Sequence, residues 1–354
     1  MNLLVINLDK GIFLSGSASL ERLKEYSQLV EKIFVIVWTI KKEKPIIFQD
    51  KLFIYPTCSR FKFLYFFDTF RILKYIKKNN KIDLLFTQDP FETGLIGWLI
   101  SKINKIPFQL QIHTDFFSPY FIRHSMLNRL RVIIAKFLIP RANCFRVVSE
   151  KIKKSLSAQK ITVLPIFVDV EKIKNTSVKT DLQRKYSQFN FIILMASRLT
   201  REKNISLAIE AVKEINNINV GLIIVGDGHE EQNLKSQISN LKINENIKIE
   251  PWTDDLVSYY KTADLFLLTS NYEGYGMTLV EAAASGCKII SSDVGIAGEI
   301  LNKENIFRVG DKKDLKEKIE KAIKGEIKAC PPLKINSKEE YLKKYKQSWE
   351  TCAS

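Results

Sequence analysis

The stretch Asn271 to Asp293, NYEGYGMTLVEAAASGCKIISSD, contains the pattern that decides the fold of this chain. It follows an apolar run at 265–268, turns through Glu273-Gly274-Tyr275-Gly276, and continues as an alanine-rich helical pattern before a second apolar run at 288–291. Strand, glycine turn, helix and strand form one crossover unit of a parallel sheet. Because such sheets bind ligands at the carboxyl ends of their strands, we expect the turn and Glu281 of the following helix to border a binding site.

The same alternation of short apolar strands and longer helices runs through the rest of the chain. Strands are expected near 3–7, 34–37, 52–55, 84–87, 108–112, 144–148, 162–164, 191–196, 220–225 and 247–250, and helices near 20–30, 65–78, 92–103, 150–157, 205–215, before 241, at 255–262 and at 337–349. This pattern predicts an α/β fold with two Rossmann-like parallel-sheet domains, 1–168 and 169–336, separated by a cleft. Pro165 and the polar run 172–185 are interpreted as the link between them.

Composition fits a chain of two globular domains. The 354 residues are 45% hydrophobic and 27% charged, which is ordinary for proteins of this size. Five cysteines are scattered singly, which argues against a disulfide framework or a zinc site and favours a reducing compartment. The opening MNLLVIN is too short and too soon followed by Asp9 to be a signal peptide. We therefore expect a cytoplasmic protein.

Positive charge is concentrated in the first half of the chain. Residues 1–170 contain 27 Lys and Arg against 13 Asp and Glu, a balance of +14, which leaves +2 of the net +16 for the rest. The asymmetry suggests an acidic substrate, nucleic acid or membrane surface as partner, and solvated lysine-rich helices explain it equally well. Basic and aromatic residues alternate at 60–67 and 116–141. These segments indicate peripheral attachment to the inner face of an anionic membrane, unless the apolar helix face is buried in the domain.

Two further loops of the second half carry candidate binding residues. Arg198 and Lys203 lie five apart in ASRLTREKN, between a strand and a helix, where two cations and a helix terminus could bind a diphosphate. Gly226-Asp227-Gly228 ends another strand, and its glycines permit close approach of a ligand. Taken singly, the first could be a solvated charged loop and the second an ordinary tight turn.

Together, these loops and the turn at 273–281 resemble the retaining glycosyltransferases of family 4, over residues 3 to about 349. The resemblance implies the GT-B fold, in which the two domains face each other across a cleft and a C-terminal helix, about 337–352, returns to the first domain. It also implies a nucleotide-diphosphate sugar as donor, a glycan or lipid-linked acceptor, and no cofactor. The chain contains no Asp-x-Asp, and we predict that Arg198 and Lys203 replace a divalent metal.

The resemblance also implies roles for single residues. Glu273 matches the glutamate that binds the hydroxyls of the transferred sugar, Glu281 the one that binds the ribose, and His113 the histidine that faces the sugar from the other domain. Donor contacts are further implied for Gly16, Arg198, Lys203, Gly226, Asp227, Gly274, Tyr275, Gly276 and Met277. Asp115 is a weaker candidate for acceptor contact or for a base.

Two departures from the family pattern limit these assignments. The first loop reads Ser15-Gly16-Ser17-Ala18, where many relatives carry a glycine pair, and Glu250-Pro251-Trp252 stands where a glycine often precedes the base-facing residue. A nucleotide-sugar epimerase or hydrolase, and a non-catalytic protein that binds nucleotides or anionic surfaces, stay open as alternatives. The intact Glu273, Glu281, Arg198 and Lys203 argue against the latter. No nucleic-acid-binding module is recognised, so nucleic acid is not expected as a partner.

Overall fold

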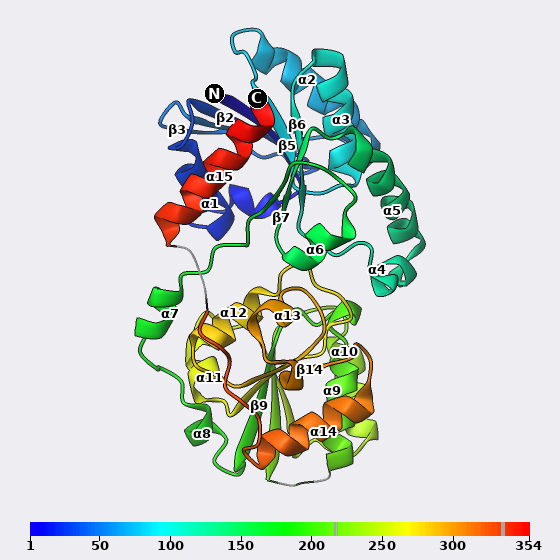
Figure 1. The fold of residues 1–354 in the computed structure, drawn as a ribbon, viewed down its shortest axis with the longest axis vertical. Helices are drawn as coiled ribbons and strands as arrows, with labels where there is room; N and C mark the ends of the chain where they lie inside the picture. Colours follow the sequence, from blue (N-terminus) through cyan, green and yellow to red (C-terminus); the bar gives the residue numbers. More distant parts are fainter. Residues whose placement is uncertain (216, 218, 334–336) are drawn as a thin grey trace.

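Two parallel β-sheets, each flanked by helices, form two domains that are stacked along the long axis of the molecule (Figure 1). The computed structural model describes residues 1–215, 217, 219–333 and 337–354. The first domain is built from the N-terminal half of the chain and also contains the C-terminal helix, which lies beside α1. The expected α/β architecture of two parallel-sheet domains is confirmed.

The first sheet has the strand order β3-β4-β2-β1-β5-β6-β7-β8. Its strands are β1 (Asn2–Asn7), β2 (Lys32–Val37), β3 (Ile46–Phe48), β4 (Leu52–Pro56), β5 (Leu84–Thr87), β6 (Phe108–Ile112), β7 (Cys144–Val147) and β8 (Ile161–Val163). Only the edge strand β3 pairs in the antiparallel sense among these described pairs. The accompanying helices are α1 (Ala18–Ser27), α2 (Tyr65–Lys77), α3 (Glu92–Asn104), α4 (Pro119–His124), α5 (Met126–Leu138), α6 (Glu150–Ser155) and α15 (Lys338–Ala353).

The second sheet has the order β11-β10-β9-β12-β13-β14. Its strands are β9 (Phe191–Ala196), β10 (Val220–Val225), β11 (Ile247–Glu250), β12 (Leu265–Leu268), β13 (Ile289–Ser292) and β14 (Ile306–Phe307). Its helices are α7 (Val170–Asn175), α8 (Leu182–Lys185), α9 (Ile205–Ile215), α10 (Glu231–Asn240), α11 (Leu256–Thr262), α12 (Met277–Ala284), α13 (Ala297–Ile300) and α14 (Lys312–Ile323).

The central strands are buried on both faces, as their continuous apolar sequences predict. All six residues of β1 and all six of β10 are buried. Parallel strands covered by helices on both sides need such runs, because neither face meets water. Each strand expected from the sequence therefore appears within a residue or two of its predicted bounds.

The chain returns to the first domain through α15, which a capping box at Ser337 begins. The Ser337 hydroxyl accepts from the Glu340 amide, and the Glu340 carboxylate accepts from the Ser337 amide. The buried face of α15 consists of Tyr341, Tyr345 and Trp349, which pack among the residues of β1, β2 and β5. This confirms the expected return of the C-terminal helix.

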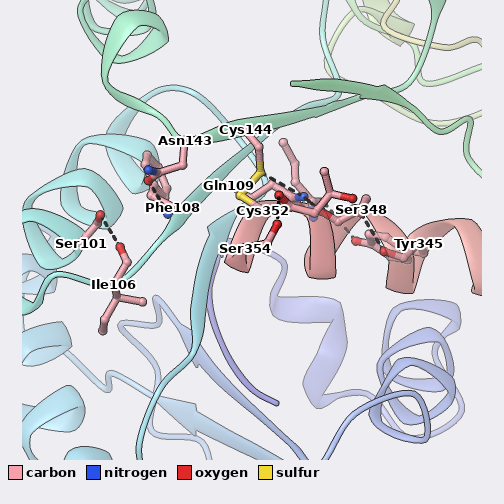
Figure 2. The surroundings of a disulfide bond; sticks show 12 residues. Ser101, Ile106, Phe108, Gln109, Asn143, Cys144, Tyr345, Ser348, Cys352 and Ser354 are labelled. Atoms are coloured by element: carbon pink, nitrogen blue, oxygen red, sulfur yellow. Dashed lines mark hydrogen bonds between the residues drawn. A yellow bond between two sulfur atoms is a disulfide. The ribbon is translucent and has the colours of Figure 1, made fainter. Parts of the chain in front are cut away.

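A disulfide joins α15 to the first sheet, contrary to the sequence-based expectation of unpaired cysteines. Cys144 in β7 is bonded to Cys352 in α15 across a sequence separation of 208, beside a hydrogen bond from Gln109 Nε2 to the Ser348 carbonyl (Figure 2). The spacing of single cysteines did not reveal the pair because only the return of α15 brings them together. The pairing also removes the cysteine argument for a reducing compartment, since disulfides persist mainly in oxidising ones.

Several elements were not expected from the sequence. The segment after the glycine-turn unit contains β14 and the helix α14, whose buried residues Leu315, Ile319 and Ala322 follow helical spacing. The polar run 172–185 contains parts of α7 and α8 instead of being an irregular link. The segment 116–141 divides into α4 and α5 at Ser125, which has an extended backbone and caps α5.

Apolar and polar contacts hold the two domains against each other. Tyr275, Val280 and Ile296 of the second domain belong to the same buried cluster as the first domain's core. The Glu150 amide at the start of α6 donates to the Glu299 carboxylate at 3.0 Å. Lys151 Nζ donates to the carbonyl of Asp293 at 2.7 Å and to its carboxylate at 2.9 Å. These contacts bring the carboxyl edge of the second sheet against the first domain.

Candidate functional site

The glycine turn that follows β12 contacts the first domain directly. A Cβ atom on Gly274 would lie 1.7 Å from the carbonyl oxygen of His113, which follows β6. Only a glycine permits the two backbones to approach this closely. The turn and the His113 backbone therefore face each other across the domain interface.

Lys203 and Glu273 form an ion pair at the centre of the site. Their Nζ and Oε1 atoms are 2.5 Å apart, and each side chain is only 14% exposed to solvent. The Ser270 hydroxyl donates to the same Oε1 atom at 2.8 Å. A carboxylate and an ammonium are thus held together at the carboxyl edge of the sheet, with water largely excluded.

Backbone contacts fix the loop after β9 to the loop after β12. The Thr269 hydroxyl donates to the carbonyl of Lys203 at 2.9 Å, and the Asn271 amide donates to the carbonyl of Glu202 at 2.7 Å. Asn204 ends the 3₁₀ turn Arg201–Lys203 in the left-handed conformation at φ 48° and directs the chain into α9. Two loops separated by about 70 residues therefore act as one support for the ion pair.

Arg198 is in the same loop but does not share this contact. Its side chain is 75% exposed, and its Nη2 atom lies 3.4 Å from the Glu202 carboxylate. Burial raises the pKa of Glu202, but hydrogen bonds from Thr200 and its own amide, together with Arg198 and Lys203, bring it below the ordinary value. Arg198 is thus an exposed guanidinium at the rim, whereas Lys203 is held inside by Glu273.

The Gly226-Asp227-Gly228 turn packs against the same loop. Cβ atoms on Gly226 and Gly228 would lie 1.9 Å from the Ser197 carbonyl oxygen and 2.2 Å from the Leu199 carbonyl oxygen. The glycines are therefore needed for loop packing, whether or not a ligand also approaches. The Asp227 side chain accepts from the amide of Trp252 at 3.2 Å, and the indole of Trp252 is 50% exposed beside it.

The helix α12 begins at the glycine turn, which lies at the domain interface. Gly276 precedes it with φ at 93°, a conformation that favours glycine. Tyr275 is buried, and its carbonyl accepts from the Ile296 amide at 3.0 Å. Met277, the first helical residue, is 38% exposed. No side chain caps this helix start in the described structure. The Leu279 amide donates to the Gly276 carbonyl at 3.0 Å, so the Met277 and Thr278 amides are the ones available to an anion.

Glu281 lies further along α12 and is half-buried. Tyr260, on α11, donates a hydrogen bond to its Oε2 atom at 3.3 Å. Burial raises the pKa of Glu281, and the bond from Tyr260 partly offsets this. Unlike Glu273, it has no cationic partner among the described residues, so its second oxygen is free to accept a hydroxyl donor.

His113 follows β6 and faces the glycine turn through its backbone carbonyl. Its Nε2 atom is buried and has no hydrogen-bond partner in the described structure. Burial, then the nearby guanidinium groups of Arg146 and Arg22, lowers the pKa of His113 to about 3, so the ring is neutral at physiological pH. Asp115 follows two residues later, and burial raises its pKa despite Lys151 and two backbone hydrogen bonds. A neutral histidine with one free nitrogen suits a hydroxyl ligand.

Gly16 is separate from these contacts. It is exposed, has φ at 74°, and a Cβ atom there would meet nothing within 4 Å. The structure gives no close approach that requires a glycine for space, and only the backbone angle favours it. Its assignment as a ligand contact stays a prediction.

Sequence reasoning missed four side chains that complete the site. Ser270 donates a hydrogen bond to Glu273, and Tyr260 donates one to Glu281. Glu202 forms an ion pair with Arg198. Tyr272 packs against Phe121 of α4 with ring centroids 5.4 Å apart. Ser270 and Tyr272 flank the quoted turn and could have been noted from its sequence. Tyr260 could not, because only the packing of α11 on α12 brings it to Glu281.

Taken together, the site offers a buried cation, an exposed cation and helix amides to an anion, and two glutamates and a neutral histidine to hydroxyl groups. A molecule with a diphosphate between two hydroxyl-bearing parts matches this set of donors and acceptors. The two-domain α/β fold with such a site at the interface defines the GT-B class of transferases.

The sequence comparisons agree with this class. Residues 180–348 match the family described as glycosyl transferases group 1, and residues 28–172 match glycosyltransferase family 4. The chain therefore belongs to the family 4 glycosyltransferases.

Individual relatives are more distant. An alpha-monoglucosyldiacylglycerol synthase of Streptococcus pneumoniae is 29% identical over 61% of this chain and 53% of its own length, so the chain spans about half of that relative. A UDP-Gal:alpha-D-GlcNAc-diphosphoundecaprenol alpha-1,3-galactosyltransferase of Escherichia coli is 26% identical over 77% and 75% of the two chains. Among solved structures, Anabaena HepE in complex with UDP has a TM-score of 0.69 at 17% identity, covering 100% of this chain and 95% of its own. That likeness confirms the GT-B fold.

Proposed function

We propose that this protein transfers a sugar from a nucleotide-diphosphate sugar, with uridine as the nucleoside, to a glycan or lipid-linked acceptor, with retention of anomeric configuration and without a metal. The observation that carries the proposal is the buried Lys203–Glu273 pair beside the free amides of the Gly274–Met277 turn. It places a carboxylate for sugar hydroxyls next to a cation and amides for a diphosphate. The uridine assignment is supported by the E. coli relative and by HepE, whose descriptions name UDP.

Each part of the site then has a chemical task. Departure of the nucleoside diphosphate places negative charge on the phosphates, and Lys203, Arg198 and the turn amides would stabilise that charge. Lys203 is fixed before the reaction, so it would stabilise the transition state without reorganisation. Arg198, exposed at the rim, would close on the phosphates when the donor binds. Gly16 and Asp227 would contribute at the borders of the donor.

Hydroxyl recognition would come from three residues on both sides of the interface. Glu273 would accept from hydroxyls of the transferred sugar, and Glu281 from the ribose. His113 would use its unpartnered Nε2 atom for a sugar hydroxyl from the first domain. Because its ring is neutral, it can take this part without placing a second positive charge beside the developing oxocarbenium-like sugar.

Retention would follow a front-face course in which the leaving phosphate accepts the proton of the acceptor hydroxyl. This course needs no protein nucleophile, and Glu273 would serve only to orient the sugar. Metal independence would rest on Lys203 and Arg198, whose charges would take the place of a divalent ion beside the diphosphate.

The test combines donor binding with product analysis. Calorimetric titration with UDP, GDP and ADP should show tightest binding of UDP, and Arg198→Gln should weaken it. Product formed from an α-linked donor should have an α-linkage by NMR, and transfer should persist in EDTA. An inverted linkage would reject the front-face course, loss of activity in EDTA would reject metal independence, and equal binding of all three nucleotides would reject uridine selection.

An apolar surface on the first domain favours a lipid-linked acceptor presented at a membrane. Among the residues that the structure describes, 16 of the 19 exposed large hydrophobic side chains precede residue 171, including Phe63, Phe67, Met126 and Ile133 at 64 to 75% exposure. A cavity of about 580 Å³ lies between α2, α3 and α5, and Leu8 and Lys10 after β1 also line it. Exposed patches of this kind beside basic residues typically mark interaction surfaces.

We infer that α5 lies on the anionic membrane surface and that the cavity takes the apolar chain of the acceptor. No helix in the described parts of the chain is long and apolar enough to span a bilayer, so attachment would be peripheral. Flotation with vesicles containing phosphatidylglycerol should recover the wild type and lose Met126→Glu with Ile133→Glu. Val178→Glu, at a 47% exposed position of the second domain, is the matched control. Equal flotation of all three proteins would contradict the membrane assignment.

A further inference from the structure

A second cationic cavity lies at the domain interface, apart from the residues assigned to the donor. Its volume is about 740 Å³, and α4 of the first domain and the segment around β14 of the second form its walls. Tyr120 of α4 donates to the carbonyl of Val309 at 3.1 Å and packs against Gly310, where a Cβ atom would lie 3.4 Å from its hydroxyl. The cavity is thus bounded by a direct contact between the domains.

Three cations line this cavity without anionic partners. Arg123 comes from α4, whereas Lys303 and Arg308 come from the second domain. All three are exposed, and no carboxylate forms an ion pair with them in the part of the chain that the structure describes. The one acidic residue on the wall, Asp293, is already bound by Lys151 Nζ at 2.9 Å. The wall therefore presents uncompensated positive charge from both domains.

Arg123 and Arg308 carry like charges on opposite sides of this domain contact. Like charges on two sides of an interface repel unless an opposite charge lies between them. A dianion between Arg123 and Arg308 would convert the repulsion into attraction to both domains. Guanidinium forks also match the oxygens of a phosphate group better than they match a monovalent ion.

The cavity adjoins the site already described through the loop after β13. Asp293 opens that loop, and a Cβ atom on Gly295 would lie 3.1 Å from Cβ of Glu273 and 2.3 Å from the Tyr275 carbonyl oxygen. On the opposite side, Phe121 of α4 packs on Tyr272, next to Glu273. An anion bound here would therefore stabilise the two segments that pack beside the glycine turn. These segments are the loop after β13 and the helix α4.

We propose that this interdomain cavity is a binding site for a phosphate-bearing ligand, distinct from the donor diphosphate loop, and that Arg123, Lys303 and Arg308 bind its phosphate oxygens. The ligand would bridge the two domains and stabilise their contact beside the glycine turn. The phosphate could belong to a free anion or to a lipid headgroup, since both present the same oxygens.

Binding of two probes tests the site and identifies the source of the phosphate. Inorganic pyrophosphate and monomeric dioctanoyl phosphatidic acid are each titrated calorimetrically into the wild type and into Arg123→Gln with Arg308→Gln. The double variant should bind the preferred probe at least tenfold more weakly, while its affinity for UDP is unchanged. Preference for pyrophosphate indicates a free anion, and preference for the phosphatidic acid indicates a lipid headgroup.

Two controls keep the test specific. Lys213→Gln with Lys321→Gln removes the same charge from exposed positions outside the cavity and should leave the affinity for both probes unchanged. Lys303→Gln, at an exposed side chain, should weaken binding severalfold and serves if the double variant does not fold. Identical affinities of the wild type and the Arg123 and Arg308 variant for both probes would overturn the proposal.

Hydrogen exchange locates the bound probe independently of the measured affinities. The preferred probe should protect backbone amides of α4 and of 303–310, in both domains at once. Protection confined to 198–204 would show that the anion binds only at the loop after β9, and it would overturn the proposal.

Discussion

Replacing Lys203 by methionine tests whether the buried ion pair is a structural as well as a chemical centre of the site. The substitution leaves Glu273 without its cation at a position where both side chains are 14% exposed. Removing one partner of a buried pair costs about 3–5 kcal/mol, because the remaining charge is desolvated without compensation. The Ser270 hydroxyl still donates to Glu273 at 2.8 Å. We therefore expect a loss near the lower bound, about 3 kcal/mol.

For a domain of about 170 residues, a loss of this size lowers the unfolding midpoint by about 6–12 °C. Thermal unfolding followed by circular dichroism measures the midpoint, and urea titration measures the free energy of unfolding. A second variant, Lys203→Met with Glu273→Met, replaces the whole pair by apolar side chains. Such replacements are often nearly neutral, so most of the lost stability should return. Both variants should lack transferase activity.

The comparison of the two variants decides the argument. If Lys203→Met unfolds within about 0.5 kcal/mol of the wild type, the range of ordinary surface substitutions, the pair is effectively solvated and the reasoning is wrong. If the double variant is less stable than the single one, Glu273 is stabilised by contacts other than Lys203. The Ser270→Ala variant is the control for the remaining hydrogen bond, and it should cost about 1–3 kcal/mol because the acceptor is charged.

Three further predictions concern pH, backbone space and the disulfide. The pKa of His113 is about 3 in the folded state against an ordinary value near 6.5. Below about pH 6.5 the unfolded state therefore binds a proton on His113 that the folded state does not. The free energy of unfolding falls for this reason as the pH drops from about 6.5 toward 3. At pH 5 this loss is about 2 kcal/mol, and His113→Asn should lose correspondingly less stability than the wild type between pH 7 and 5 in thermal unfolding. Gly274→Ala would place a Cβ atom 1.7 Å from the His113 carbonyl oxygen, whereas the Cβ atom of Gly298→Ala would meet nothing within 4 Å. Only Gly274→Ala should therefore lower kcat/KM for transfer. Equal effects of the two variants would contradict the close approach. Cys352→Ser should lower the free energy of unfolding, measured by urea titration without reductant, by about 2–5 kcal/mol. Dithiothreitol should lower the stability of the wild type to that of the variant. A wild type whose stability does not change with dithiothreitol would contradict the pairing with Cys144.

The regular elements were largely predictable because their sequences must satisfy burial locally. Continuous apolar runs such as Leu3–Ile6 predict buried parallel strands, and the runs recur at the spacing that crossover helices require. The elements that escaped prediction have weaker signals. The strand β14 contributes two residues, and α14 has only a narrow apolar stripe in a lysine-rich sequence.

The candidate site was predictable in its members but not in their arrangement. Lys203, Glu273 and His113 each stood at a strand end, and that position follows from the sequence. Their partners depend on which strand ends become neighbours, and this is set by the strand order in the sheet. Arg198 and Lys203 illustrate this dependence on the tertiary structure. They lie five residues apart in one loop, yet the side chain of Arg198 is 75% exposed and that of Lys203 is 14% exposed.

The sequence by itself determined the class of fold, the family and the turn from Asn271 to Asp293, because burial periodicity and glycine positions are local properties of the chain. The tertiary structure alone decided the contact of Gly274 with His113, the Cys144–Cys352 disulfide and the cationic cavity shared by Arg123 and Arg308. Each of these joins residues more than 150 positions apart. Their proximity results from packing two domains and returning α15 to the first, and no local pattern encodes a distance of that kind.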